Sequence, residues 1–403
     1  MNEPKLAKKG GTPVRSQPMP PRVAFGDDEY AMVLEVADYY RSRDLDPPYQ
    51  GVFEERYCGA FNDYMGGGFS DAVSTGTAAC YVAIQALDLP LGSHVLISPV
   101  TDSGPLNALI NLGFVPVLMD SREGSYNIDV ENMISRITPQ TSAVFAVHAA
   151  GEPLEINRIV QEARTRGIKV IEDCSQAPGA RCQNQPIGTF GDVAAFSTMY
   201  RKTLAAGGSG GLVYTRDENV YRRVLECADR AKPVWNRNVN LSDPSLAEYP
   251  ALNFNSNEFS CAIGLASLLR MQDAIDCRVK FLADFLKALP AYSKLCRPYA
   301  FSEAFSPFYF PIFVDHKKLR CSKTEFAEAL VEEGIPNNTH YNCLISIWHY
   351  ASRYMYDEFV ASNAMAVREN SFNLFLNENY GDREVRDIVA AIKKLETHYA
   401  LDS

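Results

Sequence analysis

Lys202 stands just after a strand-like run and just before a glycine-rich turn, in the segment FSTMYRKTLAAGGSGG. A lysine flanked by apolar strands is placed to be partly buried, and burial lowers the pKa of an amine. Such an amine is the nucleophile needed to form a Schiff base with an aldehyde cofactor. An ordinary loop lysine is the alternative, and the residues around Lys202 must decide between the two.

Asp173 closes another strand-like run, in the segment IKVIEDCSQAPGA. In an α/β protein the carboxyl ends of the strands face the ligand crevice, so this side chain is expected to point into the site. A carboxylate beside the pyridine nitrogen of pyridoxal phosphate (PLP) keeps that nitrogen protonated, and the ring then withdraws electrons during transamination. Taken alone, Asp173 would be interpreted as a helix cap or a surface acid.

A hydroxyl-rich turn, Ser74 to Ala78, precedes a helical pattern. Gly76 and Thr77 offer backbone N–H groups, a hydroxyl and the positive end of a helix to a phosphate. Simple helix capping explains the same residues almost as well. Ser197, five residues before Lys202, adds a hydroxyl at a strand end. The order phosphate turn, strand-end acid, serine and lysine is more informative than any of the four alone.

The elements that must position these residues alternate in type from about Ser70 to Tyr214. Short apolar runs are separated by helical patterns, which predicts βαβ units and a largely parallel sheet buried on both faces. The predicted strands are His94–Ser98, Val115–Asp120, Ala143–Val147, Lys169–Asp173, Ala194–Ser197 and Gly210–Thr215, and two of the predicted helices are Ala78–Leu87 and Leu154–Arg166.

We predict three parts of the chain: an N-terminal arm (1–25), a large PLP-binding α/β domain (26–265) and a small C-terminal α+β domain (266–403). The arm is basic and rich in proline. One long helical pattern, Phe259–Leu289, is expected to cross from the large domain to the small one. The small domain is predicted to contain a strand at Phe308–Val314 and helices near Lys323–Glu333 and Glu384–His398.

The composition excludes several classes of protein. Of the 403 residues, 46% are hydrophobic and 22% charged, so the chain can bury a sizeable core. A formal charge of -10 argues against general binding to nucleic acid or to an anionic membrane. No run approaches the roughly 20 apolar residues of a membrane span. Ten scattered cysteines and six histidines form no ligand motif, so we expect a cytoplasmic protein without a metal or a disulfide framework.

Seven segments carry a resemblance that covers nearly the whole chain. They are GGTPVR (10–15), STGTAA (74–79), YNID (126–129), ITPQTSAVFAVHAAG (137–151), VIEDCSQAPGA (170–180), IGTFGDVAAFS (187–197) and ALNFNSNEFSCAIGLASL (251–268). Together they resemble the DegT–StrS family of sugar aminotransferases, which are fold-type I PLP enzymes. The resemblance implies a large domain with a mostly parallel sheet sandwiched by helices and a smaller α+β domain. It also implies a homodimer with shared active sites.

The resemblance assigns roles to individual residues. Lys202 forms the Schiff base with PLP and then moves the proton, while Asp173 pairs with the pyridine nitrogen. Gln176 matches the family residue that lies near the 3′-oxygen of the cofactor. The implied phosphate-binding residues are Gly76, Thr77, Ser197 and, reaching across from the partner subunit, Asn253.

Departures from the family pattern surround the substrate side. Most members have a ring-stacking aromatic residue where this chain has Asp102 and its neighbours, so Asp102 or Ser103 is a candidate contact to the cofactor or substrate. Asn255 stands where the family usually has arginine, and Arg201 precedes the lysine where threonine is usual. These changes are typical of a subgroup with an unusual acceptor.

Four further residues are candidate substrate contacts: His148, Arg201, His340 and Tyr341. His340 and Tyr341 resemble the HY pair that borders the substrate in the family. His148 matches the histidine of the VHxxG stretch, and a satisfied strand-end histidine is an equal alternative. Arg201 would suit a phosphate or carboxylate of the substrate, and solvated surface is the alternative for it.

The expected function is transfer of an amino group from glutamate or glutamine to a keto or aldehyde carbon of a sugar, nucleotide-sugar or cyclitol, in amino-sugar or natural-product biosynthesis. Sugar 3-dehydratases of the family carry histidine in place of Lys202, so the lysine favours transamination. Two alternatives stay open: a PLP-dependent dehydratase or eliminase acting on a related substrate, and a non-catalytic PLP-binding regulatory protein.

Overall fold

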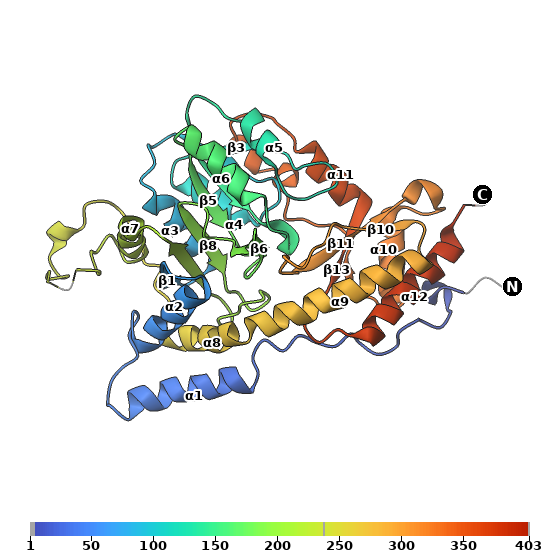
Figure 1. Ribbon diagram of the computed structural model, residues 1–403, viewed down its shortest axis with the longest axis horizontal. Coiled ribbons are helices and arrows are strands. Elements are labelled where there is room, and N and C mark those ends of the chain that lie inside the picture. The colour runs from blue at the N-terminus through green and yellow to red at the C-terminus, as the bar shows by residue number, and fades with distance from the viewer. Residues whose placement is uncertain (1–4, 237, 402–403) are drawn as a thin grey trace.

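The computed structural model describes residues 5–236 and 238–401, and shows a large α/β part and a smaller α+β part (Figure 1). The large part is built on a seven-stranded sheet. Its strands follow the order β1 (Phe69–Val73), β9 (Gly211–Thr215), β8 (Val193–Ser197), β5 (Lys169–Asp173), β4 (Thr141–Val147), β2 (His94–Ile97) and β3 (Val115–Leu118). The five strands from β8 to β3 are parallel, and β9 and β1 pair antiparallel at one edge.

Side chains of the central strands alternate between two cores. Val95 and Ile97 of β2 face one core, whereas Leu96 between them faces the other. Phe145 and Val144 of β4 divide in the same way. A sheet buried on both faces requires strands that are apolar throughout. The predicted fold class, an α/β fold with a mostly parallel sheet between helices, is confirmed.

The helices of the large part line these cores. The first core includes residues of α3 (Gly76–Ala86), α4 (Ser103–Asn111) and α7 (Glu218–Ala228), and the second includes residues of α5 (Val130–Ser135) and α6 (Ile156–Thr165). A further core lies between the sheet and two more helices, α2 (Val52–Tyr64) and α8 (Glu258–Leu269), and α1 (Asp27–Arg41) packs on α8.

The predicted single helix Phe259–Leu289 is wrong, because the structure has two helices there. The second, α9 (Met271–Tyr292), begins directly after Arg270, whose φ of -110° and ψ of 5° interrupt the helix. The Arg270 guanidinium donates to Glu29 Oε1 at 2.9 Å and to the Ala24 carbonyl at 3.1 Å. No proline or glycine marks this break, so the hydrophobic pattern alone indicated continuity.

The smaller part contains a four-stranded antiparallel sheet with three helices and the greater part of α9 alongside it (Figure 1). Its strand order is β10 (Cys296–Pro298), β11 (Tyr309–Val314), β13 (Ser371–Phe375) and β12 (Asn337–Asn338). Its helices are α10 (Lys323–Glu332), α11 (Ser362–Asn370) and α12 (Asp382–Tyr399).

Residues 5–25 of the predicted N-terminal arm lie against the smaller part before the chain reaches α1 (Figure 1), and residues 1–4 lie outside the described residues. Leu6 is buried, and Arg15 Nη1 contacts Glu384 at 3.0 Å and Asp387 at 2.6 Å, both on α12. The domain limits at 25 and 265 stay a proposal; the second falls within α8.

The remaining elements of the described residues are short. They are a hairpin of β6 (Arg181–Cys182) and β7 (Gln185–Pro186), and 3-10 turns at Ala7–Lys9, Ala149–Gly151, Pro244–Leu246, His316–Lys318, Ile345–Ile347 and Ala351–Arg353.

None of the helices within residues 5–236 and 238–401 combines the length and the apolar character that crossing a membrane requires.

Candidate active site

A cavity of about 240 Å³ opens where β5 and β8 end and where α3 and α4 begin. It collects side chains from segments that are far apart in the sequence. The predicted site residues that line it are Gly76, Thr77, Asp102, Asp173, Gln176, Ser197 and Lys202, and its other lining residues are Thr75, Cys80, Pro105, Ser175, Met199 and Ser209. The carboxyl ends of parallel strands meet at one edge of a sheet, which explains this convergence.

The beginning of α3 fits tightly against the end of β8. Thr75 caps the helix, because its Oγ1 accepts from the Ala78 N–H at 2.8 Å. A Cβ atom on Gly76 would lie 2.5 Å from Ser197 Cβ, so only glycine allows this approach. The contact brings the Ser197 hydroxyl beside the first turn of α3, where backbone N–H groups have no partner within the helix. This cradle suits a phosphate.

Asp173 is the last residue of β5 and is almost fully buried. Its Oδ1 accepts from the Ser175 N–H at 2.9 Å, which fixes the carboxylate at the cavity wall. Burial raises the pKa of Asp173, while the hydrogen bonds from Ser175 and the charge of Lys202 act in the opposite direction. The Lys202 charge thus compensates the buried Asp173 carboxylate only in part, so this carboxylate would stabilise a cationic group of a ligand.

Lys202 projects from the loop between β8 and β9, in a turn closed by its N–H and the Met199 carbonyl at 2.8 Å. Burial lowers the pKa of the Lys202 amine, and Asp173 and Asp102 partly oppose that effect. Its Nζ lies 4.5 Å from the centre of the Phe308 ring. Phe308 precedes β11 in the smaller part, and the sequence pattern there predicted only a strand.

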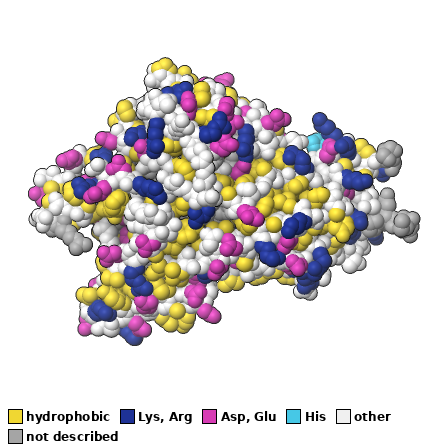
Figure 2. All heavy atoms as spheres, in the orientation of Figure 1, with side chains coloured by type: hydrophobic (Ala, Val, Ile, Leu, Met, Phe, Trp, Pro, Cys, Tyr) yellow, Lys and Arg dark blue, Asp and Glu magenta, His cyan; other side chains and the backbone are white. Residues whose placement is uncertain are grey.

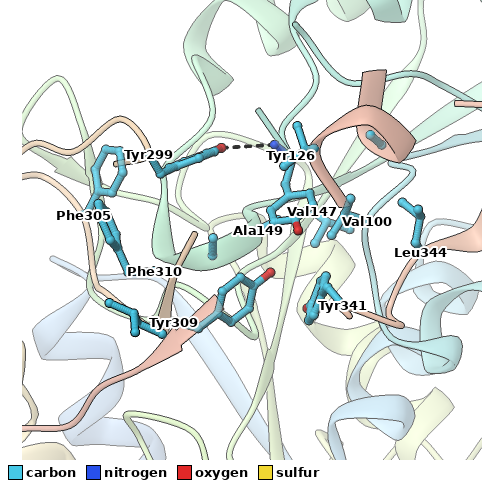
Figure 3. Close-up of a cluster of buried hydrophobic side chains, with 14 of the residues drawn as sticks. Val100, Tyr126, Val147, Ala149, Tyr299, Phe305, Tyr309, Phe310, Tyr341 and Leu344 are labelled. Atoms are coloured by element: carbon cyan, nitrogen blue, oxygen red, sulfur yellow. Dashed lines mark hydrogen bonds between the residues drawn. The ribbon is translucent and has the colours of Figure 1, made fainter. Parts of the chain in front are cut away.

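Gln176 links the cavity to the smaller part. Its Oε1 accepts from the Ala150 N–H at 3.0 Å, and its Nε2 donates to the Tyr341 hydroxyl at 3.2 Å. Figure 3 shows Tyr341 facing Tyr126 and Tyr309, with ring centres 5.5 and 4.8 Å away. Tyr341 thus lies next to a cavity residue without lining the cavity, and its substrate role stays a prediction.

His148 is fully buried beneath the strand ends. Its Nδ1 accepts from the Leu154 N–H at 3.0 Å, so the proton is on Nε2, which lies 3.2 Å from Glu172 Oε2 and donates to it. Both ring nitrogens are therefore engaged within the framework. His148, Glu172 and Cys174 bring ligand-type atoms within 4.8 Å of one another, but the imidazole has no nitrogen left for a metal ion. This arrangement corresponds to the satisfied strand-end histidine.

Asp102 caps α4, since its Oδ1 accepts from the Gly104 N–H at 3.1 Å, and its side chain lines the cavity. Ser103 begins the helix but does not line the cavity. Arg201 is exposed, with its guanidinium 5.2 Å from the centre of the Tyr200 ring.

Two predicted residues lie apart from the cavity of their own chain. His340 contacts α10, with its ring nitrogens 3.4 Å from Lys323 Nζ and 3.3 Å from Thr324 Oγ1. Asn253 is exposed, and its Oδ1 accepts from Asn255 Nδ2 at 2.9 Å. The roles predicted for His340, Asn253, Ser103 and Arg201 therefore stay predictions.

The residues of the cavity fit PLP. The cradle between Gly76 and Ser197 would bind the phosphate, and the Lys202 amine would react with the aldehyde. The Asp173 carboxylate would pair with the protonated ring nitrogen. Comparison with known proteins leads to the same chemistry, since the model of the DegT/DnrJ/EryC1/StrS aminotransferase family matches residues 34–393.

The chain belongs to this family. It is therefore a PLP-dependent aminotransferase of the sugar aminotransferase family. Membership of the family supports PLP as its cofactor. It is 29% identical over 340 residues to the spore coat polysaccharide biosynthesis protein SpsC of Bacillus subtilis, covering 83% of this chain and 87% of SpsC.

Two solved structures share the fold. An aminotransferase from Psychrobacter cryohalolentis superposes with a TM-score of 0.84 at 24% identity, over 93% of this chain and 98% of the other. The GDP-4-keto-6-deoxy-D-mannose-3-dehydratase of E. coli, with bound hydrated PLP, superposes with a TM-score of 0.81 at 22% identity, over 95% of this chain and 99% of the other. Both likenesses show that this chain has the fold of these proteins.

Proposed function

We propose that this enzyme transfers an amino group from an amino acid, glutamate or glutamine, to a keto or aldehyde carbon of a sugar, nucleotide-sugar or cyclitol. The observation that carries the proposal is the shared cavity of Lys202 and Asp173, with the first turn of α3 on the same wall. An amine, an acid and a phosphate cradle are the three groups that PLP requires.

Gly76, Thr77 and Ser197 would hold the phosphate, Asp173 the ring nitrogen and Lys202 the aldehyde carbon. When bound, PLP supplies an electron-withdrawing ring that stabilises negative charge on the neighbouring carbon. Asp173 serves this chemistry by keeping a proton on the nitrogen. Gln176, fixed by Ala150 and Tyr341, would orient the ring from its 3′-oxygen side.

Lys202 would also move the proton. Its Nζ lies in a buried environment that lowers its pKa, which favours the neutral amine that can accept a proton. Asp102 at the cavity wall would face the reacting part of the substrate in place of the usual aromatic side chain.

The deciding experiment treats the purified protein with PLP and borohydride and maps the reduced cofactor by peptide mass spectrometry. We expect the label on Lys202; a label elsewhere, or none, contradicts the assignment. With glutamate and a keto-sugar present, transamination yields 2-oxoglutarate in proportion to the amino sugar. Product without 2-oxoglutarate would identify a dehydratase or eliminase. A protein that binds PLP but forms no product and no 2-oxoglutarate would indicate the non-catalytic alternative.

We further propose a homodimer in which Asn253 completes the site of its partner. Asn253 is exposed and lies outside its own cavity. Hydrophobic side chains gather over α1 and α8 in Figure 2, and exposed apolar residues there include Tyr30, Leu34, Phe259 and Leu269. A surface of this kind commonly marks a protein interface.

Mixing two inactive variants tests the shared site. When Lys202→Ala and Asn253→Ala subunits are unfolded together and refolded, half of the dimers combine one subunit of each kind. If Asn253 acts across the interface, one site of such a dimer lacks both side chains and the other has both, so activity should return to about a quarter of the parental value. Each variant refolded alone is the control. No recovery in the mixture would place Asn253 in the site of its own chain.

A further inference from the structure

A buried arginine donates hydrogen bonds to two segments of the chain, one next to Lys202 and the other next to Phe308. Arg278 of α9 is 2% exposed, which makes it the largest fully buried side chain in the described part of the protein. Its Nη1 donates to Thr203 Oγ1 at 2.9 Å and to the Pro307 carbonyl at 3.1 Å. Thr203 directly follows Lys202, and Pro307 directly precedes Phe308. One guanidinium group therefore holds the Lys202 loop and the segment before Phe308 at a fixed distance from each other.

The charge of Arg278 is balanced from the smaller part. Its Nε and Nη2 donate to Glu378 Oε2 at 3.1 and 2.6 Å, and Arg22 donates to Glu378 Oε1 at 3.3 Å. Arg22 in turn donates to the carbonyls of Tyr200 at 3.0 Å and Thr203 at 3.2 Å. Removing one member would leave a buried charge unpaired, so the network holds the Lys202 loop firmly.

The Phe308 ring is itself packed in a fixed place. Its centre is 5.6 Å from that of Tyr309. Tyr309 in turn packs on Tyr341 (Figure 3). The Tyr341 hydroxyl accepts from Gln176. The face of an aromatic ring attracts an ammonium group through its quadrupole. This attraction is weaker than that of a carboxylate in a buried ion pair, so it stabilises a proton on Nζ without trapping it there.

We propose that Phe308 is the aromatic partner of the Lys202 ammonium group and that Arg278 is a positioning residue for this contact. The inference rests on the proposed function, in which the Lys202 amine holds and releases a proton. The charged and titratable groups that face Lys202 are Asp173 at the end of β5, Asp102 at the start of α4, Cys80 on α3 and Cys343 after β12. The variants below leave all four unchanged.

The first test measures the pKa of Lys202 in the full-length chain freed of cofactor. The readout is the pH dependence of reductive methylation by formaldehyde and cyanoborohydride, quantified at residue 202 by peptide mass spectrometry. Phe308→Leu should lower the pKa by about 1 pH unit, because the ring that stabilises the ammonium form is lost. Phe308→Tyr keeps a ring and should stay near the parental value. Equal pKa values in the parent and Phe308→Leu would overturn the proposal.

The second test addresses positioning through a matched pair at residue 203. Thr203→Val removes the hydroxyl that Arg278 binds, whereas Thr203→Ser keeps it. We expect Thr203→Val to lower the pKa of Lys202, by less than Phe308→Leu does, and Thr203→Ser to restore it. A purely structural role would lower thermal stability without moving this pKa, and that result would overturn the positioning role.

Both tests use protein without PLP, so they are independent of the borohydride mapping. A label away from Lys202 would refute the proposed function and leave the Phe308 contact measurable. An unmoved pKa together with a label on Lys202 would refute only the role of Phe308.

Discussion

Glu172 and Asp173 are adjacent carboxylates at the end of β5, and their surroundings differ completely. Glu172 accepts hydrogen bonds from the N–H groups of Gly188, Phe190 and Gly191 at 2.7 to 2.9 Å, and one from His148. Asp173 accepts from Ser175 and faces a cavity. Successive side chains of a strand point to opposite faces, so one chemical group serves the framework and its neighbour serves the site.

The two carboxylates therefore contribute to different properties, Glu172 to stability and Asp173 to ligand binding. Donors surround Glu172 on a face closed to solvent, and its negative charge is therefore compensated by the protein itself. The charges of Asp173 and Lys202 are compensated only in part, which leaves them available to a ligand. A substitution at Glu172 should consequently lower the free energy of unfolding, whereas a substitution at Asp173 or Lys202 should lower turnover.

The largest effect is expected from Lys202→Ala. Loss of the amine removes both the attachment point and the proton carrier, so turnover should fall by about 10³-fold or more. The melting temperature should stay close to the parental value, because a buried amine whose charge is compensated only in part contributes little to folding. Turnover at the parental rate in a steady-state assay would refute the assignment.

Asp173→Asn should lower kcat by about 10²-fold, since an unprotonated pyridine is a poor electron acceptor. Burial raises the pKa of Asp173, so the charge of this carboxylate costs folding energy in the protein without cofactor. The cofactor-free variant should therefore melt at the parental temperature or slightly above it. Calorimetry and kinetics on the same preparation check both statements.

Glu172→Gln is the matched control one residue away, and its effects should be reversed. An amide NH₂ in place of a carboxylate oxygen would face backbone donors, so the free energy of unfolding should fall by about 2–3 kcal/mol. Urea unfolding measures this loss. Activity per folded molecule, measured below the melting temperature, should remain close to the parental value. A selective loss of kcat would mean that the two faces are not separate.

Glu54 on α2 is a third buried carboxylate, and it has fewer hydrogen-bond donors than Glu172. Its Oε2 accepts from the Gln50 N–H at 2.8 Å, and burial raises its pKa well above that of an exposed glutamate. The folded state therefore binds the proton more tightly than the unfolded chain does, so stability should decrease as the pH rises from about 4.5 towards neutrality.

The loss should not exceed about 1.4 kcal/mol per pH unit for one proton. Glu54→Gln should flatten this dependence in melting curves recorded between pH 5 and pH 8. An unchanged slope would show that another group, such as the neighbouring Asp71, carries the effect.

Local sequence patterns predicted the central strands closely, because a short continuous apolar run such as Ala143–Val147 is typical of a strand buried on both faces. They also placed Lys202, Asp173 and Gly76 at element ends, and the topology brings these ends together. The first strand, Phe69–Val73, was not predicted, because Ser70 and Asp71 interrupt its apolar pattern.

Contacts between distant segments were not predictable in this way. Phe308 lies 106 positions after Lys202, and nothing in its neighbourhood distinguishes an aromatic residue that faces a lysine from one in a core. His340 and Tyr341 are neighbours in sequence, yet one contacts α10 and the other Gln176. A motif match does not encode this difference in contacts.

The basic, proline-rich stretch at the start of the chain has the composition of a dispensable tail. In the fold, however, Arg22 donates to two carbonyls of the loop that carries Lys202, and Arg15 forms ion pairs with the last helix. An engineered chain that begins at residue 26 would keep every side chain that lines the cavity. It would lose the hydrogen bonds that help to position the loop carrying Lys202. Residues 5–25 should therefore be kept in any engineered version of the protein.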